Sequence, residues 1–455
     1  MNEQNIPATH RELLGVAEQT RARWQVPGLA LGIMVGRTTF SSGLGVNALD
    51  TRHAVRPDTL FQVGSISKPF AATLAMSLVD DQVLDLDTPV IAYLPDLQLK
   101  DMRAAGAITP RQLLVHTGGF WGDWFADRGL GDDALHRFVA EYGALHQLTA
   151  PGELWAYNNC GYILLGRLCE VLTGQTYEQA LRERVLAPLG LEHTFLFAHE
   201  AITYPLAVGH NQEGDDAEVV IARQFLRPRA RNAAGGVIAS VDDIVRFGSF
   251  HLGAHTCDDT LSDATRVLMQ QPLVPSVAEG EFWGLGWRVT GEGSTRTFGH
   301  GGATNGFRAS LTVAPERGFV LAVLTNSSRG SAAAHEISEW ALQHYCQIKP
   351  AAPTFIDLPA ERLATLVGRY EQPYSTIEVE PQPAAGIRLQ HVSESPYYET
   401  HQPPPRVDHA RPISDHEFVV TGGEFKDSHL RFVYDAAGDV RFLQVGGRLH
   451  TPVAG

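Results

Sequence analysis

The sequence predicts an α+β chain of two parts, a mixed helix-and-sheet unit followed by a small all-β module. Three observations carry this prediction. β-like segments lie at both ends of residues 1–348, and mainly helical sequence fills the middle. Residues 349–360, KPAAPTFIDLPA, contain three prolines and no periodicity, which is typical of a linker. Residues 361–455 are short alternating segments separated by Gly and Pro turns, which predicts a sheet or small barrel.

The first unit opens with an amphipathic helix and a hairpin, GLALGIMVG (28–36) followed by TTFSSGLGV. A mainly helical region, 65–195, comes next. Phe70, Leu74 and Leu78 recur there every four residues and predict one buried helix face.

The end of this unit mirrors its beginning. Residues 308–328 predict two strands around Pro-Glu-Arg-Gly, followed by a helix over 331–346. We therefore expect one sheet built from both ends, an inserted helical subdomain, and a binding cleft between them.

Charge and composition exclude several classes of function. The chain has 455 residues and a net charge of −15, which argues against nucleic acid and anionic membrane surfaces as partners. It contains neither a signal-peptide core nor a run of about 18 apolar residues. Cys160 and Cys169 would lie on opposite faces of a helix and should not pair. We expect a reduced, cytoplasmic protein, with a homo-oligomer possible.

The stretch Ser65-Ile66-Ser67-Lys68 places a serine and a lysine on one face of a helix start. The chain has only four lysines and otherwise uses Arg. Lys68 therefore indicates a role that Arg cannot fill, because Lys loses its proton when buried and Arg does not. The alternative is a polar helix start with a solvated lysine.

Tyr157 and Asn159 lie two residues apart before the apolar run 162–168, so their side chains point the same way in an extended segment. A phenol there can relay a proton, and an amide can hold a substrate carbonyl. The alternative is that Asn159 caps a helix and Tyr157 is packed.

His300-Gly301-Gly302-Ala303 lies in a glycine-rich stretch that allows a strand edge to approach a ligand closely. His300 is the residue expected to face that ligand. The alternative is a turn with an exposed histidine.

Together, SISK, YNN and HGG resemble the β-lactamase-related serine hydrolases, in order and in context, over roughly residues 10–346. That group includes class C β-lactamases, penicillin-binding DD-peptidases, esterases and D-aminopeptidases. The C-terminal module resembles the lipocalin-like domain that some members carry.

The resemblance implies roles for these residues. Ser65 would be the nucleophile, Lys68 and Tyr157 would share the base work, and Asn159 would contact substrate. The backbone N–H groups of Ser65 and Ala303 would bind the oxyanion.

The chain departs from the group at His300-Gly301-Gly302, where β-lactamases usually have Lys-Thr-Gly. A mostly neutral histidine attracts a substrate carboxylate less well. We therefore expect an esterase or peptidase of the D-aminopeptidase type, acting on a small-molecule or short peptide-like substrate without cofactor.

Other functions stay open. These are β-lactamase or DD-peptidase activity, a non-hydrolytic acyltransferase or sensor, and a binding protein whose function lies in the C-terminal module. His251, His255 and Cys257 have a spacing that zinc accepts, but Gly253 argues against a firm helix and we expect no metal.

Overall fold

The computed structural model describes residues 6–212, 214, 217–254, 260–349, 352–382, 386–394, 405–423 and 425–453. Its main sheet is antiparallel and joins the two ends of the first unit, as the sequence predicts, in the order β2-β1-β13-β12-β11-β10-β9-β8. The strands are β1 (Gly28–Val35), β2 (Thr38–Gly45), β8 (Val274–Pro275), β9 (Glu281–Trp283), β10 (Arg288–Thr290), β11 (Thr297–Thr304), β12 (Phe307–Ala314) and β13 (Phe319–Thr325).

The central strands β1 and β13 are apolar along their whole length because helices cover both faces of the sheet. Alternate β1 residues pack against α1 (Ile6–Arg23) and α12 (Gly330–Ala341) on one face. α10 (Val241–Leu252) covers the other face. Side chains on a strand alternate between faces, so burial of both faces requires a continuous apolar sequence.

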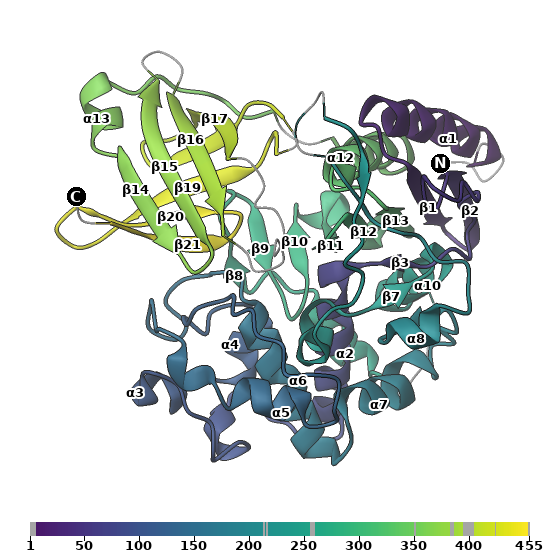
Figure 1. Cartoon of the computed structure of the whole chain (residues 1–455), viewed down its shortest axis with the longest axis horizontal. Helices are drawn as coiled ribbons and strands as arrows, with labels where there is room; N and C mark the ends of the chain where they lie inside the picture. Colours follow the sequence, from purple (N-terminus) through teal and green to yellow (C-terminus); the bar gives the residue numbers. More distant parts are fainter. Residues whose placement is uncertain are drawn as a thin grey trace.

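The helices that come between β2 and β8 in the chain lie mostly below the sheet in Figure 1. The longer ones are α2 (Ser67–Asp80) and α6 (Asn159–Thr173). The shorter ones are α3 (Met102–Ala105), α4 (Pro110–Leu114), α5 (Ala134–Val139), α7 (Tyr177–Leu181), α8 (Ala198–Ala201), α9 (Asn232–Gly235) and α11 (Asp263–Met269). Two-residue strands form a small sheet of β3 (Phe61–Gln62), β7 (Ile238–Ala239) and β4 (Thr194–Phe195), and a separate pair of β5 (His210–Asn211) and β6 (Val220–Ile221).

Helix α2 is buried on all sides, whereas the sequence predicted a single buried face. Every residue from Ser67 to Leu78 is buried. Its polar positions fit because Thr73 and Ser77 bond back to carbonyls of their own helix, Pro69 and Leu74, at 2.8 Å each. The apolar period alone therefore understated the burial of this helix.

The C-terminal module is a closed eight-stranded barrel around an apolar interior. Its elements are α13 (Ala360–Ala364), β14 (Gly368–Gln372), β15 (Ser375–Gln382), β16 (Gly386–Ser393), β17 (Arg406–Pro412), β18 (Glu417–Val420), β19 (His429–Tyr434), β20 (Val440–Val445) and β21 (Arg448–Pro452). Five of these strands contain the alternating segments of the sequence. The limits 1–348, 349–360 and 361–455 remain predictions.

The turn between β20 and β21 rests on the first unit. The backbone N–H of Tyr157 donates to the carbonyl of Gly447 at 2.8 Å. The amide of Gln444 donates to the carbonyl of Trp155 at 2.7 Å. Gly447 is tight against the Trp155 ring and Tyr157, since a Cβ there would lie 2.8 Å from the ring. Figure 1 shows the barrel beside β8 and β9 and above the α3–α6 region.

Cys160 and Cys169 both lie in α6 and are free thiols, as predicted. Within the described ranges, no His, Cys, Asp or Glu cluster is arranged to hold a metal ion. Of the three residues whose spacing zinc would accept, His255 and Cys257 lie outside the described residues. Among the described helices, none combines the length and apolarity needed to cross a bilayer.

A first prediction concerns Phe247, which is fully buried in α10 and stacks on Phe70 of α2 at 3.8 Å between ring centroids. Phe247→Ala leaves a cavity beneath α2 and should lower the free energy of unfolding by about 3–5 kcal/mol. Urea unfolding followed by tryptophan fluorescence measures this. Val267→Ala, at a position 47% exposed, is the control and should change stability by about 0.5 kcal/mol or less. Similar losses in the two variants would contradict the packing role.

Candidate active site

Ser65 lies in a single 3-10 turn, Gly64–Ile66, directly before α2. Strand β11 presses against this turn at Gly302, where a Cβ would lie 1.9 Å from the carbonyl oxygen of Val63. Gly64 has φ +53°, and a Cβ there would lie 2.6 Å from the backbone nitrogen of Ala303. Glycine is therefore required on both sides of the contact. It brings the backbone of Ala303 beside the backbone of Ser65.

The amine of Lys68 is fully buried and held by three oxygens. It lies 2.6 Å from Oδ1 of Asn159, 2.7 Å from the carbonyl of Ala234 and 3.2 Å from Oγ of Ser65. Burial holds the pKa of Lys68 well below its usual value, and the charge of Arg448 adds to this shift. A neutral amine has two N–H groups and one lone pair. In that form the two short contacts, which go to obligate acceptors, would use both N–H groups and leave the lone pair for the Ser65 hydroxyl, whereas a protonated amine would donate to Oγ of Ser65.

The structure contradicts the alternative in which Asn159 caps a helix, and the contact of Asn159 with substrate remains a prediction. Asn158, not Asn159, caps α6, since its Oδ1 accepts from the N–H of Gly161 at 2.7 Å. Asn159 bonds Lys68 through Oδ1, and its Nδ2 donates to Asp123 at 2.5 Å. The contact with Asp123 fixes the orientation of the amide, so that its oxygen faces the amine.

Tyr157 completes the group around Ser65. Burial raises the pKa of Tyr157, and a hydrogen bond with Ser65 opposes the shift, so the phenol keeps its proton near neutral pH. The amine of Lys68 lies 4.8 Å from the centre of the Tyr157 ring. The structure therefore gathers Ser65, Lys68, Tyr157 and Asn159 in one place, as the sequence predicted.

His300 lies in β11 rather than in a turn and is only 5% exposed. Its ring centroid is 6.1 Å from that of Tyr157 and 5.6 Å from that of Trp283. Burial, with a smaller effect from Lys68, lowers the pKa of His300 to about 3. The imidazole is therefore neutral at pH 7. Gly301 and Ala303, not His300, are the exposed residues of this stretch.

Arg448 of the barrel enters the site beside Tyr157, and no pattern in the sequence pointed to this residue. Its guanidinium lies 4.6 Å from the centre of the Tyr157 ring and bonds Asp123 at 3.1 Å. Burial alone would lower the pKa of Arg448, but Asp123 raises it above the usual value. Burial opposes ionisation of Asp123, but Arg448 and Asn159 hold the pKa of Asp123 below its usual value. A charged pair therefore lies against the candidate site.

Comparisons with known proteins agree with this geometry. A family model described as "Beta-lactamase" matches residues 16–344. "Penicillin-binding protein 4" of Amycolatopsis lactamdurans is 34% identical over 81% of this chain and 99% of its own length. "Unguisins hydrolase ungD'" of Aspergillus campestris is 27% identical over 70% of this chain and 61% of its own length. The crystal structure of SurE with D-Leu is 26% identical, covers 98% of this chain and all of that chain, and has a TM-score of 0.77.

These findings confirm the family resemblance and the β-lactamase/transpeptidase-like fold predicted from the sequence. The closed barrel is consistent with the lipocalin-like domain that we expected. The SurE likeness extends over both parts of the chain.

A second prediction separates the two neighbouring asparagines. Asn158→Ala removes the α6 cap and the 2.8 Å bond from Nδ2 to the carbonyl of Phe120. It should lower the unfolding free energy by about 2 kcal/mol. Asn159→Ala should change stability less, but should slow labelling of Ser65 by a fluorophosphonate, because Lys68 loses its partner. Urea unfolding and intact-mass kinetics measure the two effects. If Asn159→Ala instead lowered stability and Asn158→Ala slowed labelling, Asn159 would be the residue that caps α6.

Proposed function

This chain belongs to the beta-lactamase family of serine hydrolases, and we propose that it cleaves an ester or peptide-like amide through an acyl-enzyme on Ser65. One observation carries the proposal. The buried amine of Lys68 lies 3.2 Å from Oγ of Ser65, and in its neutral form it would spend both N–H groups on Asn159 and Ala234 and offer its lone pair to the Ser65 hydroxyl. A nucleophile within reach of a neutral base is the requirement for acyl transfer.

In the proposed acylation, Oγ of Ser65 bonds the substrate carbonyl carbon while its proton moves to Nζ of Lys68. The oxygen of the tetrahedral intermediate takes the negative charge and is bound by the N–H groups of Ser65 and Ala303. The bond to the leaving amine or alcohol then breaks. Tyr157 delivers a proton to the leaving group and regains one from Lys68, which restores both residues.

Deacylation repeats these steps with water in place of the leaving group. Water attacks the acyl carbonyl and gives its proton to the Lys68–Tyr157 pair. The tetrahedral intermediate then expels Ser65, which is reprotonated. The pKa of Lys68 is lowered and that of Tyr157 is raised. We therefore assign the amine as the group that accepts the proton of Ser65 and the phenol as the group that passes a proton to the leaving group.

Arg448 supports a substrate that bears a carboxylate on the leaving-group side. His300 is neutral and offers no cation. Arg448 is 28% exposed, charged, and adjacent to the tyrosine that would protonate the leaving group. A guanidinium fork can bind a carboxylate through two parallel hydrogen bonds, whereas here Asp123 accepts one bond, from Nε of Arg448, and Nη1 donates to the carbonyl of Gly446.

One similar structure supports a substrate derived from an amino acid, since it is described as SurE with D-Leu, an amino acid. We favour a short peptide or amino-acid derivative with a free carboxylate over a β-lactam.

Two alternative functions remain. An acyltransferase would use the same site residues, and a binding protein would use the barrel instead. An acyltransferase would pass the acyl group to an added amine rather than to water, so product analysis with and without an acceptor distinguishes it. A binding protein with a vestigial first unit would keep its ligand affinity in Ser65→Ala and lose it when the barrel is deleted.

A cytoplasmic location and a homo-oligomer remain predictions. Light scattering of the purified chain tests the oligomeric state.

A third prediction concerns the base. Lys68→Arg introduces a guanidinium that stays protonated and cannot accept a proton, so acylation of Ser65 by an activated ester should slow by about 10²–10⁴-fold. In the wild type, acylation should rise with pH through the lowered pKa of Lys68. It should therefore already be high well below pH 10.5, the ordinary lysine value.

Intact-mass analysis with peptide mapping measures the adduct, and Ser65→Ala should show none. Lys100→Arg is the matched control, since Lys100 is exposed on the surface. An adduct on another residue, or equal rates in Lys68→Arg and the wild type, would sink the proposal.

A fourth prediction concerns Arg448. For a pair of dipeptide substrates that differ only in a free or amidated C-terminus, Arg448→Gln should lower the ratio of kcat/KM (free over amidated) about tenfold or more. The ratio cancels any general disturbance of the site. Arg369→Gln, on the barrel surface and 54% exposed, is the control. An unchanged ratio in Arg448→Gln would refute carboxylate recognition and leave the Ser65 chemistry standing.

A further inference from the structure

Asp123 connects the barrel to the base of the candidate site. Its carboxylate is buried, and each of its oxygens bonds a different partner. Oδ1 accepts from Nδ2 of Asn159 at 2.5 Å, and Oδ2 accepts from Nε of Arg448 at 3.1 Å. Oδ1 of Asn159 in turn lies 2.6 Å from the amine of Lys68. A continuous chain of hydrogen bonds therefore runs from a barrel arginine to the buried amine.

The residue before Asp123 ties its backbone to the start of α6. The carbonyl of Gly122 accepts the backbone N–H groups of Asn159 and Cys160, at 2.9 Å each. A Cβ at Gly122 would lie 2.7 Å from the carbonyl oxygen of Tyr157, so the absence of a side chain allows the two segments to approach this closely. The backbone that carries Asp123 is therefore fixed against the turn that carries Asn159.

The orientation of the Asn159 amide decides whether Lys68 can act as a base. With its oxygen toward the amine, as here, Asn159 accepts an N–H of Lys68. In the opposite orientation, Nδ2 would donate to the lone pair of a neutral amine and would compete for it with the Ser65 hydroxyl. An ionised carboxylate only accepts hydrogen bonds, so Asp123 can bond Nδ2 of Asn159 but not Oδ1. Asp123 therefore holds the orientation that leaves the lone pair available.

Several titratable groups surround Lys68, and half of them are neutral near pH 7. Burial raises the pKa of two phenols and lowers the pKa of two imidazoles, so none of these four carries a charge. They are Tyr157, Tyr162, His116 and His300. The charged groups are Asp123, Arg227, Arg231 and Arg448. A change in the charge around Lys68 must come from this second set.

The charged groups have opposite effects on Lys68. Burial is the main cause of its lowered pKa, Arg448 lowers the pKa further, and Asp123 raises it. Arg231 and Arg227 also lower it, but both belong to the segment that precedes α9 in the first unit. Of these three arginines, Arg448 alone comes from the barrel. The charge balance at the amine therefore depends on the contact between the barrel and Asp123.

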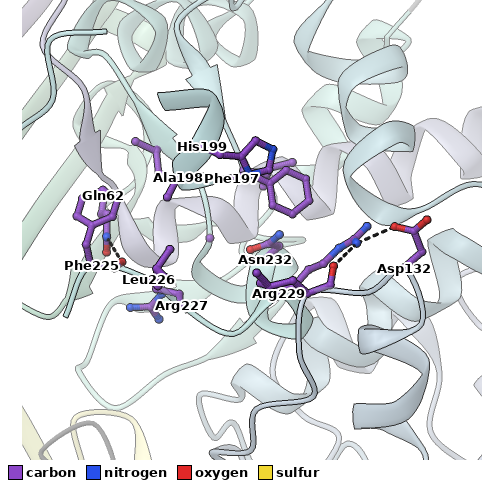
Figure 2. A pocket seen from close by; sticks show the side chains of 14 residues that line it. Gln62, Asp132, Phe197, Ala198, His199, Phe225, Leu226, Arg227, Arg229 and Asn232 are labelled. Carbon is purple, nitrogen blue, oxygen red and sulfur yellow. Dashed lines mark hydrogen bonds and ion pairs between the residues drawn. The ribbon is translucent and has the colours of Figure 1, made fainter. Parts of the chain in front are cut away.

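A further arginine of the segment before α9 is engaged elsewhere. Arg227 and Arg229 line a cavity of about 480 Å³, and none of the candidate site residues is among the described residues that line it. Figure 2 shows Arg229 turned toward Asp132, which it bonds at 2.7 Å. Arg229 also pairs with Glu178 at 3.0 Å. Two carboxylates hold this guanidinium, so it takes no part in the chain of hydrogen bonds described above.

We propose that Asp123 is a positioning residue for the reaction at Ser65. It holds the oxygen of Asn159 on Lys68, and its bond to Arg448 links this arrangement to the docked barrel. The inference rests on the proposed function, since it assumes that Lys68 deprotonates Ser65. The barrel thus affects the base of the site, in addition to any contact that Arg448 makes with substrate.

The first test measures the acylation of Ser65 by p-nitrophenyl acetate as a function of pH. This ester has no carboxylate, so carboxylate recognition by Arg448 does not enter the result. Arg448→Gln removes a cation near Lys68, and the amine then holds its proton more tightly. The pH at which the rate is half of its maximum should therefore rise by about one unit.

Arg441→Gln is the matched control. Arg441 is also a barrel arginine that pairs with a carboxylate of the first unit, in this case Glu153. Its other contact is to the carbonyl of Leu148, at 3.3 Å. Weakening the barrel contact here should move the midpoint by less than about 0.3 unit, because the ion pair is partly exposed and screened. Equal shifts in the Arg441 and Arg448 variants would overturn the proposal.

The second test changes Asp123 itself. Asp123→Asn removes the negative charge but keeps an oxygen that can accept from Asn159, so the midpoint should move to lower pH, opposite to Arg448→Gln. Asp123→Ala removes the acceptor as well. It should lower the limiting rate at high pH about tenfold or more, because Asn159 can then turn Nδ2 toward the amine. Thermal melting confirms that each variant is folded.

A limiting rate in Asp123→Ala equal to that of the wild type, or an unchanged midpoint in Arg448→Gln, would refute the positioning role. So would a shift of Asp123→Asn to higher pH. Failure of the proposed function looks different, because Ser65 would then take neither the acetyl group nor a fluorophosphonate label in the wild type.

Discussion

The burial of one amine is the constraint on which the rest of this structure depends. Lys68 is enclosed by oxygens from segments 91 and 166 residues away in the chain. Desolvation favours the neutral amine, and the two short contacts decide where its lone pair points. Helix α2 therefore has to be buried on all sides, and the helices α6, α9 and α10 pack against it. The fold and the candidate chemistry therefore both depend on the burial of Lys68.

The barrel adds a boundary to one side of this arrangement. Its β20–β21 turn lies on Trp155 and Tyr157 and brings a guanidinium to a site whose own histidine is neutral. The cation that the His-Gly-Gly stretch lacks is thus supplied from the other end of the chain. The proposed substrate accordingly carries its charge on the leaving side.

Glycines set how closely the parts approach. Gly302 allows β11 to touch the backbone before Ser65, Gly447 allows the barrel to touch Trp155, and Gly235 leaves room for Arg227. The first two contacts are between segments distant in sequence. The glycine-rich stretch at 299–302 was recognisable in the sequence because its glycines are clustered. Gly235 and Gly447 each belong to a pair of glycines and gave no comparable signal.

The sequence by itself determined the relations that local geometry fixes. The spacing of Ser65 and Lys68 on a helix start, the hairpin at 28–46 and the alternation of the barrel segments follow from helix and strand periods. Tertiary structure alone decided three features. These are the lowered pKa of Lys68, the capping of α6 by Asn158 rather than Asn159, and the position of Arg448 beside Asp123, 325 residues away. The reason is physical: desolvation and charge pairing depend on which distant segments surround a group. No period in the sequence records those neighbours.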